Sequence, residues 1–156
     1  MGVCVLLGSK SDLEKAEKAF QIFRDFNVEY EVHIASAHRT PERVKEIVEK
    51  TEHEVFLVFA GLSAALPGAV AALTTRPVIG VPLSGKVPLD SLLSMVQMPK
   101  GVPVGVVGVD NAVNGALLCI EILALRNEEL KNKLKRYRET QKEKVLRDDE
   151  EVQKHV

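Results

Sequence analysis

The chain contains several uninterrupted apolar runs of strand length, and these alternate with segments of helical periodicity. The runs cover residues 3–7, 55–61, 77–82 and 102–109, and a more polar strand is expected at 30–35. A strand that is apolar on both faces must be covered on both sides, which is typical of parallel sheets. Because parallel neighbours need long crossover connections, the segments between the runs should form helices.

The segments between the runs have the features of helices. Apolar residues recur at three- and four-residue spacing between residues 13 and 26, and Ser11 and Glu14 have the spacing of a capping box at its start. Thr40 precedes Pro41 in the order expected at a helix N-terminus. The alternation predicts an α/β protein, a three-layer, flavodoxin-like doubly wound parallel sheet, in which ligands sit at the carboxyl ends of the strands.

The last part of the chain is densely charged and predicts a C-terminal helix that extends past the sheet. Its apolar stripe is thin and runs through Leu130, Leu134 and Tyr137 to Gln141. Such a stripe usually packs on another surface, so we interpret it as a contact with another subunit; a solvated terminal helix is the alternative. With no repeat and no linker in the sequence, we expect one domain over 1–156, with 126–156 as an extending helix and tail.

Composition argues against several classes of partner. The 156-residue chain has a net charge of -1 and no Trp, so we expect neither a basic surface nor a stacking platform for nucleic acid. No apolar run reaches the roughly 18 residues of a membrane span, and no secretory leader precedes the first strand. Cys4 and Cys119 lie in apolar runs, and their spacing suits neither a metal site nor a redox pair. They are predicted to be buried free thiols in a reducing, cytoplasmic environment.

The segment GVPLSGK at residues 80–86 satisfies the pattern of a phosphate-binding loop but lacks its context. Gly80 lies within a predicted strand, and Val87 replaces the Ser or Thr that would hold magnesium. No fingerprint of three spaced glycines follows the first strand either. We therefore expect neither a nucleoside triphosphate nor a dinucleotide cofactor.

The loop GSKSD, residues 8–12, joins the first strand to the first helix. Backbone amides at a helix start attract anions, and the hydroxyls of Ser9 and Ser11 can add hydrogen bonds to them. Asp12 can bind a sugar hydroxyl. A polar turn with a capping serine would have the same composition, so this loop alone leaves the two interpretations open.

The loop SAHRT, residues 36–40, carries a stronger signal. Arg39 precedes a helix start, where a guanidinium can pair with a phosphate through two hydrogen bonds. His38 has an ordinary pKa of about 6.5, so it can accept or donate a proton near neutral pH. The alternative is a loop histidine without a catalytic role.

The segment AGLSAALPG, residues 60–68, ends the third strand in small residues. A glycine such as Gly61 lets backbone approach a planar ligand closely, and Ala64, Ala65 and Leu66 suit the wall of a small, dry pocket. Close packing of a helix on the sheet would explain the same small residues. We expect the loops 8–12, 36–40 and 61–67 to converge on one crevice.

These stretches, together with SLLSMVQMPKGVPVG, resemble one family in their order and spacing. They are similar to the purine-biosynthesis family of aminoimidazole ribonucleotide carboxylases and N5-carboxyaminoimidazole ribonucleotide mutases, over residues 3–145. The resemblance implies a cytoplasmic homo-oligomer, an octamer in the family, that acts on a ribonucleotide and CO2. It also implies that no metal, nucleoside triphosphate or organic cofactor takes part.

The resemblance implies roles for individual residues. His38 matches the proton-transfer residue, which removes the proton from ring carbon C4 after carboxylation, and Arg39 matches a phosphate ligand. The other positions that it implies contact the substrate are Ser9, Ser11, Asp12, Ser36, Ala37, Gly61, Ser63 and Leu66.

The two branches of the family differ in the third motif. The mutase moves a carboxyl group from the exocyclic nitrogen to C4, and its motif usually ends in a histidine where this chain has Ala65. The carboxylase adds CO2 directly, and Ser63 and Ala65 agree with its motif whereas Leu62 and Ala64 do not. Arg39 agrees with the mutase. The absent histidine favours direct carboxylation as the main hypothesis, with the mutase reaction as the alternative.

Two other classes of protein share the predicted fold. A flavin-binding electron carrier would need aromatic residues around the flavin, which this chain does not supply. A phospho-receiver domain would need an aspartate at the end of the third strand, where the sequence has Ala60 and Gly61. Both remain remote alternatives.

Overall fold

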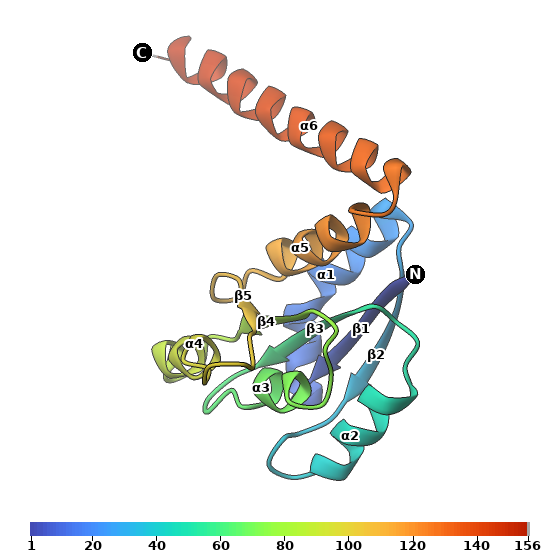
Figure 1. The fold of residues 1–156 in the computed structure, drawn as a ribbon. Coiled ribbons are helices and arrows are strands. Elements are labelled where there is room, and N and C mark those ends of the chain that lie inside the picture. The colour runs from blue at the N-terminus through green and yellow to red at the C-terminus, as the bar shows by residue number, and fades with distance from the viewer. Residues whose placement is uncertain (156) are drawn as a thin grey trace.

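The fold is built on one parallel five-stranded sheet, seen in a computed structural model that describes residues 1–155 (Figure 1). The strand order is β2-β1-β3-β4-β5. This order and the helices on both faces confirm the predicted flavodoxin-like doubly wound fold. The strands are β1 (Gly2–Leu7), β2 (Glu29–Ile34), β3 (Val55–Ala60), β4 (Val78–Pro82) and β5 (Gly105–Val106).

Helices cover both faces of the sheet (Figure 1). One face carries α1 (Leu13–Phe26) and α5 (Ala112–Ala124), and the other carries α2 (Pro41–Lys50), α3 (Leu66–Ala71) and α4 (Pro88–Val96). Successive side chains of a strand point to opposite faces, so each central strand contributes to two cores. Val5 of β1, for example, packs toward α1 and α5, whereas Leu6 packs toward α2 and α3.

Two local features allow α1 and α5 to pack closely on the sheet. Asn27 ends α1 in the left-handed conformation at φ 57°, which asparagine tolerates better than most residues. Gly115 of α5 lies so close to the sheet that a Cβ there would come within 2.8 Å of Val81 Cγ2. A larger residue at position 115 would therefore push α5 away from β4.

The last strand is much shorter than the sequence predicts. The apolar run 102–109 contains only the two-residue strand β5, which pairs with Ile79 and Gly80 of β4. Pro103 lacks an N–H for the ladder, and β5 is an edge strand with a partner on one side only. The edge position of β5 and the proline together limit its hydrogen bonding with β4, although the apolar sequence pattern continues beyond the strand.

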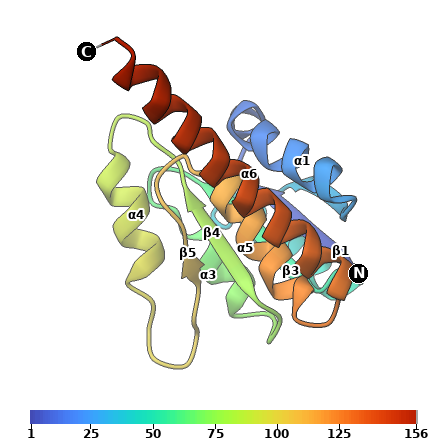
Figure 2. The same ribbon diagram turned by 90° about the horizontal axis from the view of Figure 1, so that it is seen from above.

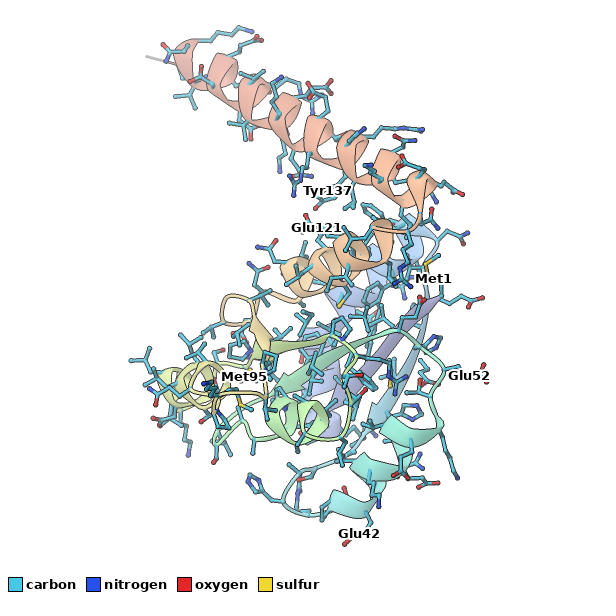
Figure 3. The ribbon with its side chains drawn as sticks, in the orientation of Figure 1. Met1, Glu42, Glu52, Met95, Glu121 and Tyr137 are labelled. Carbon is cyan, nitrogen blue, oxygen red and sulfur yellow. The ribbon has the colours of Figure 1, made fainter. Side chains whose placement is uncertain are left out.

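The C-terminal helix α6 (Glu128–Gln153) extends past the sheet, as predicted, and crosses over α5 (Figure 2). Its apolar stripe makes contacts within the same chain, and the predicted contact with another subunit stays a prediction. Leu130 is buried, Tyr137 reaches toward α5 (Figure 3), and its ring lies 5.7 Å from that of Phe26. Arg138 adds a 2.5 Å contact to Glu121 of α5. Within residues 1–155, neither α6 nor another helix combines the length and apolarity needed to cross a membrane.

Candidate active site

A cleft lies at the carboxyl edge of the sheet, where the connections after β1 and β3 leave toward opposite faces. Such a switch point is where ligands bind in doubly wound sheets. The cleft has a volume of about 680 Å³, and the three loops predicted to converge all contribute to it. Every residue that the sequence singled out lies on its wall: Ser9, Ser11, Asp12, Ser36, Ala37, His38, Arg39, Gly61, Ser63 and Leu66.

The loop after β1 is ordered by its own polar side chains. The backbone N–H of Ser9 donates to Asp12 Oδ2 at 2.9 Å, and the hydroxyl oxygens of Ser9 and Ser11 lie 2.6 Å apart. These contacts form a short 3-10 turn over residues 10–12 before α1 begins at Leu13. The predicted capping pair Ser11 and Glu14 is therefore wrong, because the turn places the equivalent pair at Ser9 and Asp12. Serine hydroxyls and backbone amides remain presented to the cleft.

The loop after β2 is closed by Ser36 and Thr40. The N–H of Ser36 donates to Thr40 Oγ1 and the N–H of Thr40 to the carbonyl oxygen of Ser36, each at 2.9 Å. Arg39 is held across the cleft wall, since its Nη2 donates to the Gly8 carbonyl oxygen at 3.2 Å and its Nε to Ser36 Oγ at 3.4 Å. The guanidinium thus links the first two loops and remains exposed.

The His38 ring is exposed to the cleft. Among the residues that the structure describes, no protein group forms a hydrogen bond or ion pair with it. A ring with free nitrogens at the wall of a cleft can exchange a proton with a bound molecule.

The loop after β3 forms the apolar side of the cleft. Ala64 and Leu66 are buried, and Leu62 and Ser63 are exposed at the rim. Leu62 adopts φ 52°, a conformation that costs a branched, bulky residue energy and that concentrates at functional sites. Gly61 lies close beside Leu83, the first residue after β4.

A fourth wall follows β4, and the sequence reasoning missed it. Leu83, Ser84, Gly85 and Val87 line the cleft, as does Lys15 of α1. The signal was present, because this segment directly follows a predicted strand of a parallel sheet and so belongs at the same edge. Gly80 lies inside β4, as the sequence predicts, and the residues after this strand line the cleft even though the phosphate-loop pattern at 80–86 does not apply.

Lys15 ties the fourth wall to the first helix. Its ammonium donates to the carbonyl oxygen of Ser84 at 2.9 Å, to Ser84 Oγ at 2.7 Å and to Asp110 Oδ1 at 2.7 Å. The N–H and the hydroxyl of Ser84 also donate to the Asp110 carboxylate. Burial alone would raise the pKa of Asp110, but the hydrogen bonds from Lys15 and Ser84 outweigh it and hold the pKa below its ordinary value.

Comparisons with known proteins agree on one family. The family described as AIR carboxylase matches residues 2–144. A protein of Methanocaldococcus jannaschii named N5-carboxyaminoimidazole ribonucleotide mutase is 55% identical over 151 residues, 96% of each chain. The chloroplastic phosphoribosylaminoimidazole carboxylase of Vigna aconitifolia is 44% identical over 96% of this chain and 28% of its own length. The crystal structure of Treponema denticola PurE has a TM-score of 0.88 at 30% identity, covering 96% of both chains.

Proposed function

The chain belongs to the AIR carboxylase family, and we propose that it acts in purine biosynthesis as an N5-carboxyaminoimidazole ribonucleotide mutase. The sequence favoured direct carboxylation as the main hypothesis and the mutase as its alternative. Relatives with the mutase name match 90–96% of this chain, and they support the alternative over the main hypothesis.

One observation carries the proposal. An exposed histidine that has no hydrogen-bond or ion-pair partner within residues 1–155 faces a cleft whose other walls supply serine hydroxyls, an arginine and small apolar side chains. A ribonucleotide needs each of these. Its phosphate is a ligand for Arg39 and for the amides and hydroxyls of residues 8–12, and its ribose is a ligand for Asp12. The planar ring then lies near His38 and the apolar loop after β3.

The chemistry that follows requires little from the protein beyond position and one proton carrier. The bond between the exocyclic nitrogen and its carboxyl group breaks, CO2 departs, and the nitrogen takes a proton from the protonated His38 ring. The nucleophilic ring carbon C4 then attacks that CO2 and forms the new carbon–carbon bond. The C4 proton leaves to restore aromaticity and His38 accepts it, so the histidine ends in the protonation state in which it began. The apolar wall formed by Ala64 and Leu66 holds CO2 beside the ring and excludes water.

Direct carboxylation of the aminoimidazole ribonucleotide is the second candidate. It is favoured by Ser63 and Ala65, which line the cleft where the mutase motif usually carries a second histidine. The two reactions share their product and the proposed proton transfer at His38. They differ in where CO2 comes from.

Two parallel assays on the purified chain distinguish them. Efficient conversion of freshly prepared N5-carboxyaminoimidazole ribonucleotide, with slow use of aminoimidazole ribonucleotide at modest CO2, is the expected result. Fast use of the second substrate with little use of the first would establish the carboxylase instead. The absence of both activities in a folded protein would overturn the proposal for this cleft.

We further propose that the chain acts in the cytoplasm as a homo-oligomer, an octamer by analogy with its family. Exposed apolar side chains support association, notably Leu89 and Leu93 on α4 and Val145 and Leu146 on α6. Leu89 and Leu93 are one turn apart on α4, and burying each exposed apolar pair against another chain would stabilise an oligomer. Light scattering should give a molar mass of several chains, and a monomer at working concentration would contradict the proposal.

A further inference from the structure

Three side chains that can bind a metal lie together at the β2 edge of the sheet, away from the cleft. Cys4 of β1 is directly opposite Glu31 of β2 in the parallel register, and His33 follows two residues later on β2. Residues two apart on a strand share a face, so all three point to the same side of the sheet. Cys4 places this side in the layer of α2 and α3.

The donor atoms are already near one another. The thiol of Cys4, a carboxylate oxygen of Glu31 and a ring nitrogen of His33 lie within 4.8 Å of one another, and Glu31 Oε1 is 3.5 Å from His33 Nε2. Cys4 is fully buried, whereas the Glu31 and His33 side chains are 36% and 27% exposed. Since β2 pairs only with β1, this cluster can be reached from the open side of the sheet.

One buried oxygen atom of the cluster accepts no hydrogen bond from the described residues. Glu31 Oε1 is buried and has no hydrogen-bond donor among residues 1–155. A buried carboxylate oxygen without a donor costs free energy, and a cation would remove that cost. His33 beside it is cationic only when protonated, and the other nearby cation is Arg76, whose charge acts on the Cys4 thiol.

The fold also makes room for a second imidazole next to the cluster. His53, on the loop between α2 and β3, packs against Gly2, and a Cβ at position 2 would lie only 2.6 Å from His53 Nδ1. Gly2 and Cys4 are two residues apart on β1, so His53 is on the same face as the cluster. Burial by itself would raise the pKa of the nearby Glu31 carboxyl group, but hydrogen bonds with Thr51 and Cys4, together with the charges of His33 and His53, hold it below its ordinary value.

We propose that Cys4, Glu31 and His33 form a site for Zn²⁺ or a closely similar divalent ion, with His53 or water as the fourth ligand. One sulfur, one nitrogen and one oxygen donor suit zinc, which accepts all three in tetrahedral geometry at about 2.0–2.3 Å. Ligands at these distances from a tetrahedral ion lie roughly 3.3–3.8 Å from one another, so donors that are already within 4.8 Å of one another need to approach by only about an ångström.

The thiol gives the site a property that can be tested. A bound ion would replace its proton, because the thiolate is the form that binds metal. The ion would join the edge strand β2 to β1, and β2 leads directly into the loop that carries His38. This role is structural and does not depend on the proposed reaction.

Cobalt titration of the full chain, stripped with a chelator, tests the site, because a thiolate bound to Co²⁺ gives a charge-transfer band in the near ultraviolet. We expect the band in the wild type and in Cys119→Ala, whose thiol is buried in the opposite layer, and its loss in Cys4→Ala. His33→Gln, at a half-buried position that should not disturb folding, should weaken Co²⁺ binding more than about tenfold. His155→Gln, in the tail, should leave it unchanged.

Two outcomes would overturn the proposal. One is the absence of a thiolate band in the folded wild type at saturating Co²⁺. The other is a band of equal strength and affinity in both Cys4→Ala and His33→Gln. Circular dichroism of each variant identifies a failure to fold, and His33→Gln decides the result if Cys4→Ala does not fold. The assay uses no substrate, so its result is independent of the proposed mutase activity.

Discussion

Replacing His38 with asparagine separates catalysis from stability in this cleft. The His38 ring is exposed and forms no hydrogen bond or ion pair with the described part of the chain. The substitution therefore removes no intramolecular contact, and the free energy of unfolding should change by less than about 0.5 kcal/mol. Substrate binding should persist as well, because the residues proposed to bind the phosphate are other residues of the cleft.

The expected loss is in the chemical step. A positioned general acid or base contributes roughly 10²–10⁴-fold to the rate. At about 1.36 kcal/mol for each factor of ten, His38→Asn should raise the barrier by about 3–5 kcal/mol. The drop should be in kcat, with KM changed only slightly, since the interaction is made mainly in the transition state.

Steady-state kinetics with the preferred substrate, together with urea unfolding of the same preparations, measures both quantities. His155→Asn is a matched control, because His155 is an exposed histidine in the C-terminal tail, far along the chain from the cleft. A His38→Asn variant that retains more than about a tenth of the wild-type kcat would refute the proton-transfer role. A loss of rate that is matched by a loss of folded protein would refute the claim that the ring is structurally dispensable.

Three further predictions concern the walls of the cleft. Arg39→Ala should raise KM by roughly 10–100-fold, since it removes the charged hydrogen bonds proposed to hold the substrate phosphate. Arg43→Ala, outside the cleft, is the control and should leave KM unchanged. Equal KM values for the two variants, measured from initial rates at varied substrate concentration, would contradict this. Leu62→Gly should raise the free energy of unfolding, measured in urea, by about 0.5–1 kcal/mol, because glycine adopts the left-handed φ of 52° without strain. A lower free energy of unfolding would show that Leu62 is not strained. Lys15→Met should cost less than about 1 kcal/mol, since its ion pair with Asp110 is partly exposed. Because the pKa of Asp110 is depressed in the folded state, this stabilisation is present above the carboxyl's ordinary pKa of about 4 and is lost as pH falls through the folded value. The wild-type and Lys15→Met unfolding curves should therefore converge in acid, and a difference that grows toward low pH would show that the sign is wrong.

Much of the fold could be predicted because the relevant information is local. Apolar runs buried on both faces indicate parallel strands, and the strand ends indicate where the loops gather. Pro41 was correctly predicted at the start of α2, since a proline has few other places in a helix. The prediction was wrong where neighbouring strands decide the outcome, because the ladder of β5 is cut short by its edge position and Pro103. The packing of α6 on α5 and Phe26 could not be predicted, because these contacts join residues far apart along the chain.

The candidate site also combines features that the sequence shows with contacts that only the fold creates. The sequence by itself determined which loops hold hydroxyls, a guanidinium and an imidazole, because these follow strands in a recognisable order. Only the tertiary structure decided that Arg39 reaches Gly8 and that Lys15 and Asp110 fasten the fourth wall, since those partners are far apart along the chain. Likewise, the spacing of Cys4 and Cys119 gave no reason to expect a metal ion. The donors beside Cys4 come from a neighbouring strand, and strand pairing alone brings them within reach.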